Sequence, residues 1–558
     1  ERRALYDGLA ARGLPTVSIR GVLDVELGAL AGLAADNWAT IERRLALNIH
    51  QILNGIRTEL LPVTLPVQDR LVINLGTAGR IGWSPGYDLA LAATLVGEDG
   101  AREPGASLSL EAAMERAARS HPDVLAASAR RRVEEMEVEA LRSSYRPQVE
   151  IGADAVYLGF GDRINPRTTP RSARELSLGA QVTQLLFSDQ LSQAVSAQRQ
   201  RVEATEQESE SIRLDAMERA GLAYLVALSS EALYRIEKEN LRITENNLQL
   251  AKLRYEIGAA DPTEVYRWQS GQAQARSLLI QRDASRHKAL VSLNVALGAP
   301  RTAAWTLEDI QLDDDDFYFM DDSLEEVVQS RRQYERYLDF VRRKASERSP
   351  EIAAFERALT AQGILLTERR RRNYLPTMSV AARVDRVYQD GPGVDFDGQN
   401  EWAVGVGFSI PLFDGGRRRA ESRQIVSAQR ELEAQRDGAI YLVEQRALAA
   451  GLGISASHPT MRLSRVARGA ARSNFDVVQF KYSRGQASII DLLDAQRQLL
   501  ELQRNEAVSV YEYLQDVISL QRAMAWFEFE QSDAEREKWG NELRASLISD
   551  TPNGGSDR

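Results

Sequence analysis

The stretch Leu253-Arg-Tyr-Glu-Ile-Gly258 recurs later in the chain as Phe480-Lys-Tyr-Ser-Arg-Gly485, 227 residues further on. Both stretches carry a basic residue, then a tyrosine, and a glycine three positions after the tyrosine. Other landmarks occur in the same order and in nearly the same register: His121-Pro122 with Ser349-Pro350, Tyr145 with Tyr374, Leu186-Phe187 with Leu412-Phe413, and Gln269 with Gln496. So many matches in one register indicate a tandem duplication over residues 107–299 and 337–528.

The composition favours long helices and excludes several chemistries. The chain has 558 residues, enough for two or three domains, with 43% hydrophobic and only 7% aromatic residues. Its 70 basic and 80 acidic residues give a net charge of −10, which argues against a nucleic-acid partner. There is no cysteine, which excludes disulfides, thiolate metal sites and cysteine nucleophiles. With only four histidines, we expect no metal site and no cofactor.

Each copy of the repeat predicts one helix followed by two strands. The helix is broken by Tyr-x-Pro, because proline cannot continue helical hydrogen bonding. One strand of each pair alternates between apolar and small or polar residues with a period of two, and the loops between strands are rich in Gly, Pro and Asp. The expected helices are 110–142 and 337–372, the strand pairs 149–157 with 176–186 and 378–387 with 402–412, and the loops 159–174 and 389–400.

Very long helices follow the strands. Residues 189–257 contain no proline and would span on the order of 100 Å as one helix, at ~1.5 Å per residue. Apolar residues at steps of three and four predict a coiled-coil-like seam. Gly258 and Gly485 are expected to end these helices, and Pro262 begins the next one. Pro459 predicts a kink or interruption that the first copy lacks.

The strands suggest a membrane, but only as part of an assembly. No apolar run approaches the ~20 residues of a spanning helix, whereas strands of ~10 residues match a bilayer. Four strands cannot close on themselves, and an open sheet edge in lipid would leave backbone groups without partners. Closure would therefore need several chains. The alternative on pattern alone is a soluble helical bundle that carries two hairpins.

One motif in the second copy carries a family resemblance. The run Lys481-Tyr-Ser-Arg-Gly-Gln-Ala-Ser-Ile-Ile-Asp-Leu-Leu-Asp-Ala-Gln496 resembles the signature of the TolC family of outer-membrane channel-tunnels, as do Tyr374-Leu-Pro376, Pro411-Leu-Phe-Asp-Gly-Gly416 and the duplication itself. The resemblance covers residues 107–528. It implies a mainly α fold with β structure: a homotrimer whose 12-stranded outer-membrane β-barrel stands on a long α-helical barrel. Residues 300–336 would form an equatorial segment between the repeats.

The resemblance also implies functional residues at the periplasmic tip of the tube, where Gly258 and Gly485 make the turns. Asp491 and Asp494 match pore-constriction aspartates, and their spacing of three puts both on one helix face. The alternative is that they are exposed acids at a helix N-terminus, where the dipole favours negative charge.

Other positions at the same tip match the residues that close it. Tyr482 matches a tip-closing tyrosine, with Thr263 and Glu264 on the acceptor side. Ala487 stands where the family has an arginine that links protomers, so this chain departs from the family's closure network.

The ends of the chain lie outside the duplication. Residues 1–99 predict short buried strands at 14–20 and 70–75 and a helix at 36–54. This segment resembles the C-terminal end of an ABC-transporter substrate-binding protein, and is expected to be a partial α/β unit. Residues 529–558 are expected to be a polar C-terminal tail.

Together these observations predict a non-enzymatic exit duct in the outer membrane that extends into the periplasm. It would serve efflux of small molecules or type I secretion, together with a periplasmic adaptor (membrane fusion) protein and an inner-membrane pump or ABC transporter. Three alternatives stay open: a soluble periplasmic coiled-coil scaffold, a solute-binding protein with a helical extension, and a hydrolase using Asp491 and Asp494. The last requires a shielded pocket, which a seam helix seldom provides.

Overall fold

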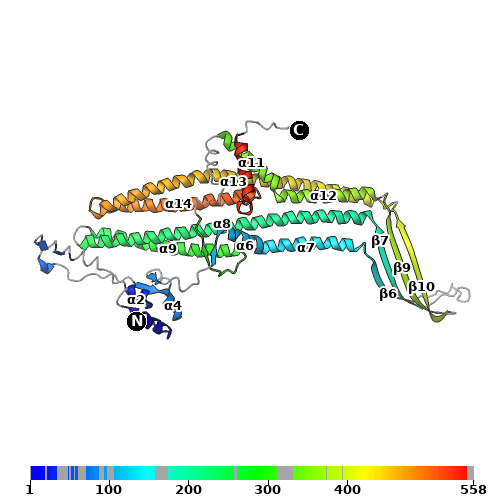
Figure 1. Cartoon of the computed structure of the whole chain (residues 1–558), viewed down its shortest axis with the longest axis horizontal. Coiled ribbons are helices and arrows are strands. Elements are labelled where there is room, and N and C mark those ends of the chain that lie inside the picture. The colour runs from blue at the N-terminus through cyan, green and yellow to red at the C-terminus, as the bar shows by residue number, and fades with distance from the viewer. Residues whose placement is uncertain are drawn as a thin grey trace.

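The two copies of the repeat fold alike and run side by side along the long axis of the molecule (Figure 1). The fold is taken from a computed structural model. It describes residues 2–18, 22–33, 71–86, 106–157, 174–256, 260–310, 331–372, 374–391, 394–411 and 413–548, with short pieces at 45, 48–49, 52–53, 55, 57–60, 89 and 93–96. The helix expected at 36–54, the loop at 159–174 and most of the segment between the repeats lie wholly or mostly outside the described residues.

Each copy contains two short helices, two strands and two long helices. In the first copy these are α6 (Leu110–Ser120), α7 (Pro122–Ser143), β6 (Gln148–Tyr157), β7 (Arg174–Phe187), α8 (Asp189–Glu256) and α9 (Pro262–Ala296). In the second they are α11 (Arg331–Arg348), α12 (Pro350–Arg371), β9 (Thr377–Gly391), β10 (Val394–Ser409), α13 (Arg417–Ser483) and α14 (Ile489–Ala523). The fold is therefore mainly helical with some sheet, as the sequence predicts.

The expectation of one continuous helix before the strands is wrong in both copies. The helix is divided at Pro122 and at Pro350, each of which begins the second piece. Proline is suited to the first helical position, because its missing N–H would have no partner there. The residue before each proline caps the new helix: His121 Nδ1 accepts from the Asp123 N–H at 3.2 Å, and Ser349 Oγ accepts from the Ile352 N–H at 3.3 Å.

The four strands of the two copies form one antiparallel sheet in the order β10-β9-β7-β6. The two hairpins meet where β7 pairs with β9, so the sheet joins the halves of the chain, and β6 and β10 are its edges. The loop expected at 389–400 is largely strand, because β9 runs to Gly391 and β10 begins at Val394. The ladder continues there, with Gly398 opposite Tyr388 and Asn400 opposite Arg386.

One face of this sheet is apolar across all four strands. The register places Val406 beside Val380, Val380 beside Gln184, and Val182 beside Val149, so alternate residues share a face. Several large apolar side chains on this face are strongly exposed: Ile151 at 83%, Trp402 at 78% and Phe408 at 67%. The opposite face carries Glu150, Gln181 and the ion pair of Arg383 with Asp385. The single chain thus leaves an apolar sheet face without a cover.

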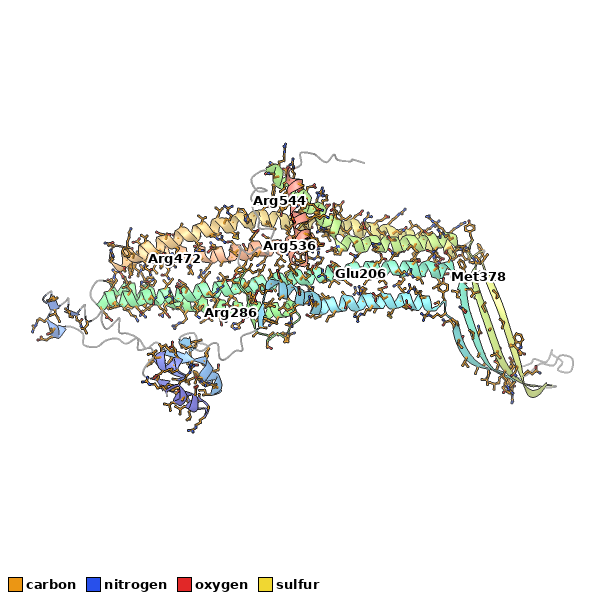
Figure 2. All side chains as sticks on the ribbon, viewed as in Figure 1. Glu206, Arg286, Met378, Arg472, Arg536 and Arg544 are labelled. Carbon is orange, nitrogen blue, oxygen red and sulfur yellow. The ribbon has the colours of Figure 1, made fainter. Side chains whose placement is uncertain are left out.

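The long helices form two antiparallel hairpins, α8 with α9 and α13 with α14, which reach away from the sheet to a common tip (Figure 1). Arg472 lies toward that tip, and Met378 lies at the junction of helices and sheet (Figure 2). None of the helices described here has both the length and the apolar character required to cross a membrane.

Helix α13 continues through Pro459, so the predicted interruption does not occur. Hydroxyl groups around the proline bond to helix carbonyls: Ser455 Oγ donates to Gly451 O at 2.7 Å, and Ser457 Oγ donates to Gly453 O at 3.0 Å. The same stretch packs closely against its neighbours. A Cβ on Gly453 would lie 3.0 Å from the Asp516 carboxylate. Close packing around this stretch therefore keeps α13 helical at Pro459, where the proline removes one backbone hydrogen bond.

The C-terminal segment is not simply a polar tail. Residues Asp533–Ile548 form helix α15, and Trp539, Leu543 and Leu547 are buried in the core with Phe340 and Val341 of α11. The Trp539 ring stacks on Trp526 with centroids 5.1 Å apart. These apolar residues recur every four positions and form one helical stripe.

The N-terminal segment has its own small sheet, ordered β1-β2-β3-β4. Its strands are β1 (Val17–Ser18), β2 (Ala31–Leu33), β3 (Leu71–Asn74) and β4 (Thr94–Val96), and its helices are α1 (Arg2–Ala10), α2 (Val22–Glu26) and α4 (Leu75–Arg80). Leu30, Ile73 and Ala78 form its core. Midway along the hairpins, β5 (Ala106–Leu108) pairs in parallel with β8 (Trp305–Leu307).

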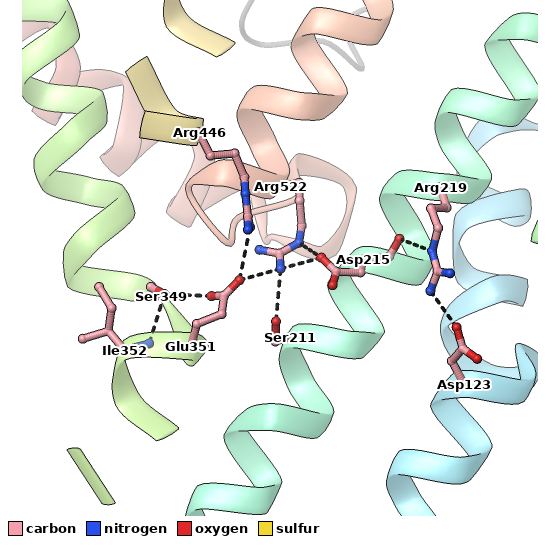
Figure 3. Close-up of polar contacts among 9 residues, drawn as sticks. All are labelled: Asp123, Ser211, Asp215, Arg219, Ser349, Glu351, Ile352, Arg446 and Arg522. Atoms are coloured by element: carbon pink, nitrogen blue, oxygen red, sulfur yellow. Dashed lines mark hydrogen bonds and ion pairs between the residues drawn. The ribbon is translucent and has the colours of Figure 1, made fainter. Parts of the chain in front are cut away.

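A buried arginine at the C-terminal end of α14 joins the two copies of the repeat (Figure 3). The Arg522 side chain of α14 is only 2% exposed. Its Nε donates to Asp215 Oδ1 of α8 at 2.6 Å, and its Nη2 donates to Glu351 Oε1 of α12 at 2.7 Å. Arg446 of α13 also donates to Glu351, at 3.1 Å. Burial would raise the pKa of Glu351, but Arg522 and the Ser349 hydroxyl outweigh it and hold this pKa at about 2.

We expect Glu351→Gln to lower the midpoint of thermal unfolding. A carboxylate with a depressed folded-state pKa stabilises the fold above its unfolded pKa, near 4.5, and loses that contribution as pH falls toward 2. At neutral pH the loss is of order 2 kcal/mol, discounted for partial exposure. Circular dichroism melts from pH 7 to pH 2 measure it. Glu356→Gln, an exposed acid on the same helix, is the control; equal effects of the two changes would contradict the prediction.

Candidate functional site

The tip, where the long helices turn, is the candidate functional site. Helix α8 ends at Glu256 and α9 begins at Pro262, while α13 ends at Ser483 and α14 begins at Ile489. Gly485 has φ of +74° in the second turn, a conformation that favours glycine. Gly258, its counterpart in the first turn, lies outside the described residues.

Tyr482 is buried at the centre of the tip, with no exposed surface. Its hydroxyl donates to Glu264 Oε2 at 2.9 Å, which links α13 to α9. The Arg254 guanidinium lies 4.5 Å from the tyrosine ring centre, and its Nη1 donates to the Tyr482 carbonyl at 3.1 Å. Burial and the neighbouring Glu264 raise the pKa of Tyr482 to about 12. The phenol therefore stays protonated and can donate at any physiological pH.

Thr263 is exposed and serves the start of α9. Asp261 caps this helix by accepting from the Thr263 N–H at 2.8 Å, and that hydrogen bond lowers the pKa of Asp261. Of the two residues expected on the acceptor side of Tyr482, the structure brings only Glu264 to the tyrosine hydroxyl.

An apolar cluster supports the tyrosine. Tyr482 and Trp268 are buried among Leu248, Phe475 and Leu492, and these five residues come from the four long helices. Ala487 packs partly buried against the same cluster. The position that lacks the family's arginine therefore contributes a small apolar contact to the tip core.

Asp491 and Asp494, in the first two turns of α14, are both exposed. Asp491 belongs to a capping box: its Oδ2 accepts from the Ser488 N–H at 2.9 Å and from Ser488 Oγ at 2.7 Å, while Ser488 Oγ accepts from the Asp491 N–H at 3.2 Å. These hydrogen bonds from Ser488 lower the pKa of Asp491. Asp494 makes no hydrogen bond or ion pair within the part of the chain that is described.

A buried amide network lies above the tip and was not predicted from the sequence. Gln496 Oε1 accepts from Asn247 Nδ2 at 3.2 Å, and Gln496 Nε2 donates to Asn240 Oδ1 and Thr244 Oγ1, both at 3.0 Å. Gln496 is 8% exposed, so the network fixes α14 against α8. The repeated glutamine, Gln269 with Gln496, was the signal available in the sequence.

The hydrogen bonds at the tip hold the long helices together, and two carboxylates stay exposed beside them. Over the described residues, no group of three or more His, Asp or Glu side chains is placed to hold a metal ion. What the tip offers is a set of hydrogen bonds between helices and two exposed carboxylates at the start of α14.

Known proteins resemble the chain over both repeats. The family profile described as outer membrane efflux protein matches residues 113–299 and 341–525. The outer membrane efflux protein BepC of Brucella suis is 24% identical over 398 residues, covering 71% of this chain and 81% of BepC. The outer membrane protein TolC of Escherichia coli is 23% identical over 430 residues, covering 73% and 80%. The crystal structure of the Campylobacter jejuni CmeC outer membrane channel superposes with a TM-score of 0.59 at 13% identity, covering 78% and 89%.

Replacing Tyr482 with phenylalanine should loosen the tip. The change removes the hydroxyl that binds Glu264 but keeps the ring that packs in the cluster, so we expect faster amide hydrogen exchange at the end of α13 and the start of α9. Hydrogen–deuterium exchange mass spectrometry measures this. Tyr266→Phe is the matched control, because Tyr266 lies on the same helix as Glu264 and is 66% exposed. Unchanged exchange in Tyr482→Phe would show that the hydrogen bond does not hold the tip.

Proposed function

Since the chain belongs to the outer membrane efflux protein family, and so is an outer-membrane efflux channel, we propose that it forms a homotrimeric exit duct. Three copies of its four-stranded sheet would close a 12-stranded β-barrel in the outer membrane. The helical hairpins would form a tube below it in the periplasm. The observation that carries this proposal is the open sheet with one continuous apolar face.

The sheet edges support closure by further copies. β6 and β10 each pair on one side only among the described strands, so their outer backbone groups require partners in lipid. Apolar side chains cover one face and polar side chains the other, which is the alternation of a transmembrane barrel. Lipid would cover the apolar face, and the lumen would be lined by the polar one.

The helices support the tube. Helix α8 has 68 residues, and at ~1.5 Å per residue it spans about 100 Å from the sheet to the tip. Such a length reaches far from the membrane surface. The segment at 300–336, with β8 and the start of α11, would belong to an equatorial belt midway along the tube.

The tip residues would make the constriction of this tube. Asp491 and Asp494 of three protomers would form rings of carboxylates, which attract cations and repel anions. Tyr482 and Glu264 would hold the tip closed, with Thr263 at the helix start beside them and Gly258 and Gly485 in the turns. The low pKa of Asp491 keeps this carboxylate charged at neutral pH.

A duct of this kind would need partners that supply energy and contact its tip. We propose a periplasmic adaptor and an inner-membrane pump or ABC transporter as those partners, for efflux of small molecules or for type I secretion. One relative, OpmQ of Pseudomonas putida, is described as a pyoverdine export outer membrane protein. We propose no cofactor and no enzymatic activity.

We also propose a division of the chain into units. Residues 107–299 and 337–528 are the two repeats, 300–336 connects them, and 1–99 is a small α/β unit related to substrate-binding proteins. Residues 529–558 follow the second repeat, and α15 fastens them to its core.

The assembly is tested by extraction of the full chain from membranes in detergent. Light scattering corrected for detergent should give three times the chain mass of 62.2 kDa, and the protein should fractionate with the outer membrane. A water-soluble monomer would contradict the duct and favour a periplasmic scaffold.

Neutralising the constriction should change ion selectivity. We expect Asp491→Asn with Asp494→Asn to lower cation preference severalfold in planar bilayers, because the carboxylate rings lose their charge. The matched control is Glu501→Gln with Glu512→Gln, which removes two exposed acids from the same helix away from the tip. A double aspartate variant with unchanged reversal potentials would remove this assignment.

A further inference from the structure

The contact between the two copies at the tip has a counterpart that stays exposed in the single chain. Along the long helices near the tip, each residue of the first repeat corresponds to one 227 residues later in the second. Suppose that the two repeats of every chain alternate around a ring. Inside each chain, the second repeat then contacts the first. Between chains, the second repeat of one chain contacts the first repeat of the next, and we expect an equivalent contact there. The residues of that recurring contact can therefore be named.

We propose that a second copy of this chain docks at the tip through two paired contacts, Tyr255 with Asp491 and Gln269 with Asn474. Tyr255 and Gln269 belong to α8 and α9 of one protomer, and Asp491 and Asn474 to α14 and α13 of the next. The inference rests on the proposed trimer and specifies how its tip is held together.

The first paired contact, Tyr255 with Asp491, corresponds to the contact of Tyr482 with Glu264 in the other repeat. Shifting by 227 residues turns Tyr482 into Tyr255, Glu264 into Asp491 and Arg254 into Lys481. A phenol, a carboxylate and a cation recur, although Tyr482 is fully buried and Tyr255 is 49% exposed. Asp491 binds Ser488 through Oδ2 alone, which leaves Oδ1 to accept from a tyrosine hydroxyl.

The second paired contact is the repeat mate of the buried amide pair. Gln496 and Asn247 are 8% and 3% exposed and bind each other within the chain. Their mates are Gln269 and Asn474, again a glutamine and an asparagine, and both are exposed. The same two amide residue types thus recur at the offset of 227 residues, and here both side chains are exposed. An interface between two chains would pair them as the single chain pairs Gln496 with Asn247.

Further from the tip, the charged residues that join the two repeats within the chain correspond, at the offset of 227 residues, to apolar residues. The mates of Arg522 and Asp215 are Val295 and Leu442, which are 56% and 62% exposed. The outer side of α13 carries further exposed apolar residues, namely Leu452, Leu463, Val466, Val477 and Phe480. The contact between the two repeats within the chain is thus an ion pair. The corresponding surface that would face the next chain is apolar, as expected of a surface that a second chain covers.

The two paired contacts would hold neighbouring protomers together at the tip. Ala487 cannot do so, because it lacks the side chain of the arginine that the family has at this position. Tyrosine–carboxylate links would alternate around the tip, Tyr482 with Glu264 inside each protomer and Tyr255 with Asp491 between protomers. Asp491 would then cap its own helix with one oxygen and bind the neighbouring protomer with the other.

The absence of cysteine allows a direct test by cross-linking. Full-length Gln269→Cys with Asn474→Cys, in outer-membrane vesicles, is treated with methanethiosulfonate cross-linkers. Asn247→Cys with Gln496→Cys calibrates the reagent, since this pair lies in hydrogen-bonding contact within one chain. The shortest reagent that links the calibration pair is used throughout. Gln269→Cys with Asp476→Cys is the mismatch control, because Asp476 is exposed two positions further along α13.

We expect dimers and trimers on denaturing gels from Gln269→Cys with Asn474→Cys, at least tenfold above the mismatch control. The calibration pair should stay at monomer mass. A trimer by light scattering without this excess would overturn the proposed pairing and leave the duct intact. A monomeric mass would overturn both, and the two failures are thus distinguishable.

Discussion

The free edges of the four-stranded sheet constrain the rest of the molecule. Backbone N–H and C=O groups at β6 and β10 need hydrogen-bond partners wherever water is absent, and no further strand among the described residues of the chain supplies them. Exposed apolar residues such as Ile151 and Trp402 exclude water as a stable surrounding for that face. The trimer proposed above would meet both demands together.

The duplication makes such completion possible with one sequence. Because β7 pairs with β9 across the repeat boundary, the junction that the proposed trimer would need between protomers already exists once inside each chain. The two junctions need not be chemically equal. Arg522 buries its charge against Asp215 and Glu351 inside the chain, where folding fixes all partners. A buried ion pair is costly to assemble from separate chains, so apolar Val295 and Leu442 suit the second junction better.

Periodic features were predictable from the sequence, whereas contacts between distant elements were not. The helix expected from 189 to 257 is α8, and the strand expected from 176 to 186 lies within β7, because proline and alternation act locally. The break at Pro350 was readable, since Ser349, a residue type favoured at helix N-caps, precedes it. The Arg522 cluster and the partners of Gln496 were not readable, because each joins residues more than 150 positions apart. Helix α15 was missed because its stripe of Trp539, Leu543 and Leu547 is short, and its partner Phe340 lies far back in the chain.

The tip assigns different tasks to carboxylates that look alike in sequence. Glu264 accepts from a buried phenol, so its charge serves cohesion and not ions in solution. Asp491 is fixed by the capping box of α14, and this fixes the place of its charge relative to the helix start. Asp494, one turn further on, is exposed and bound to no described neighbour. In the proposed trimer, the Tyr482–Glu264 link would therefore set how firmly the tip holds, and Asp491 and Asp494 would set the charge that a passing ion meets.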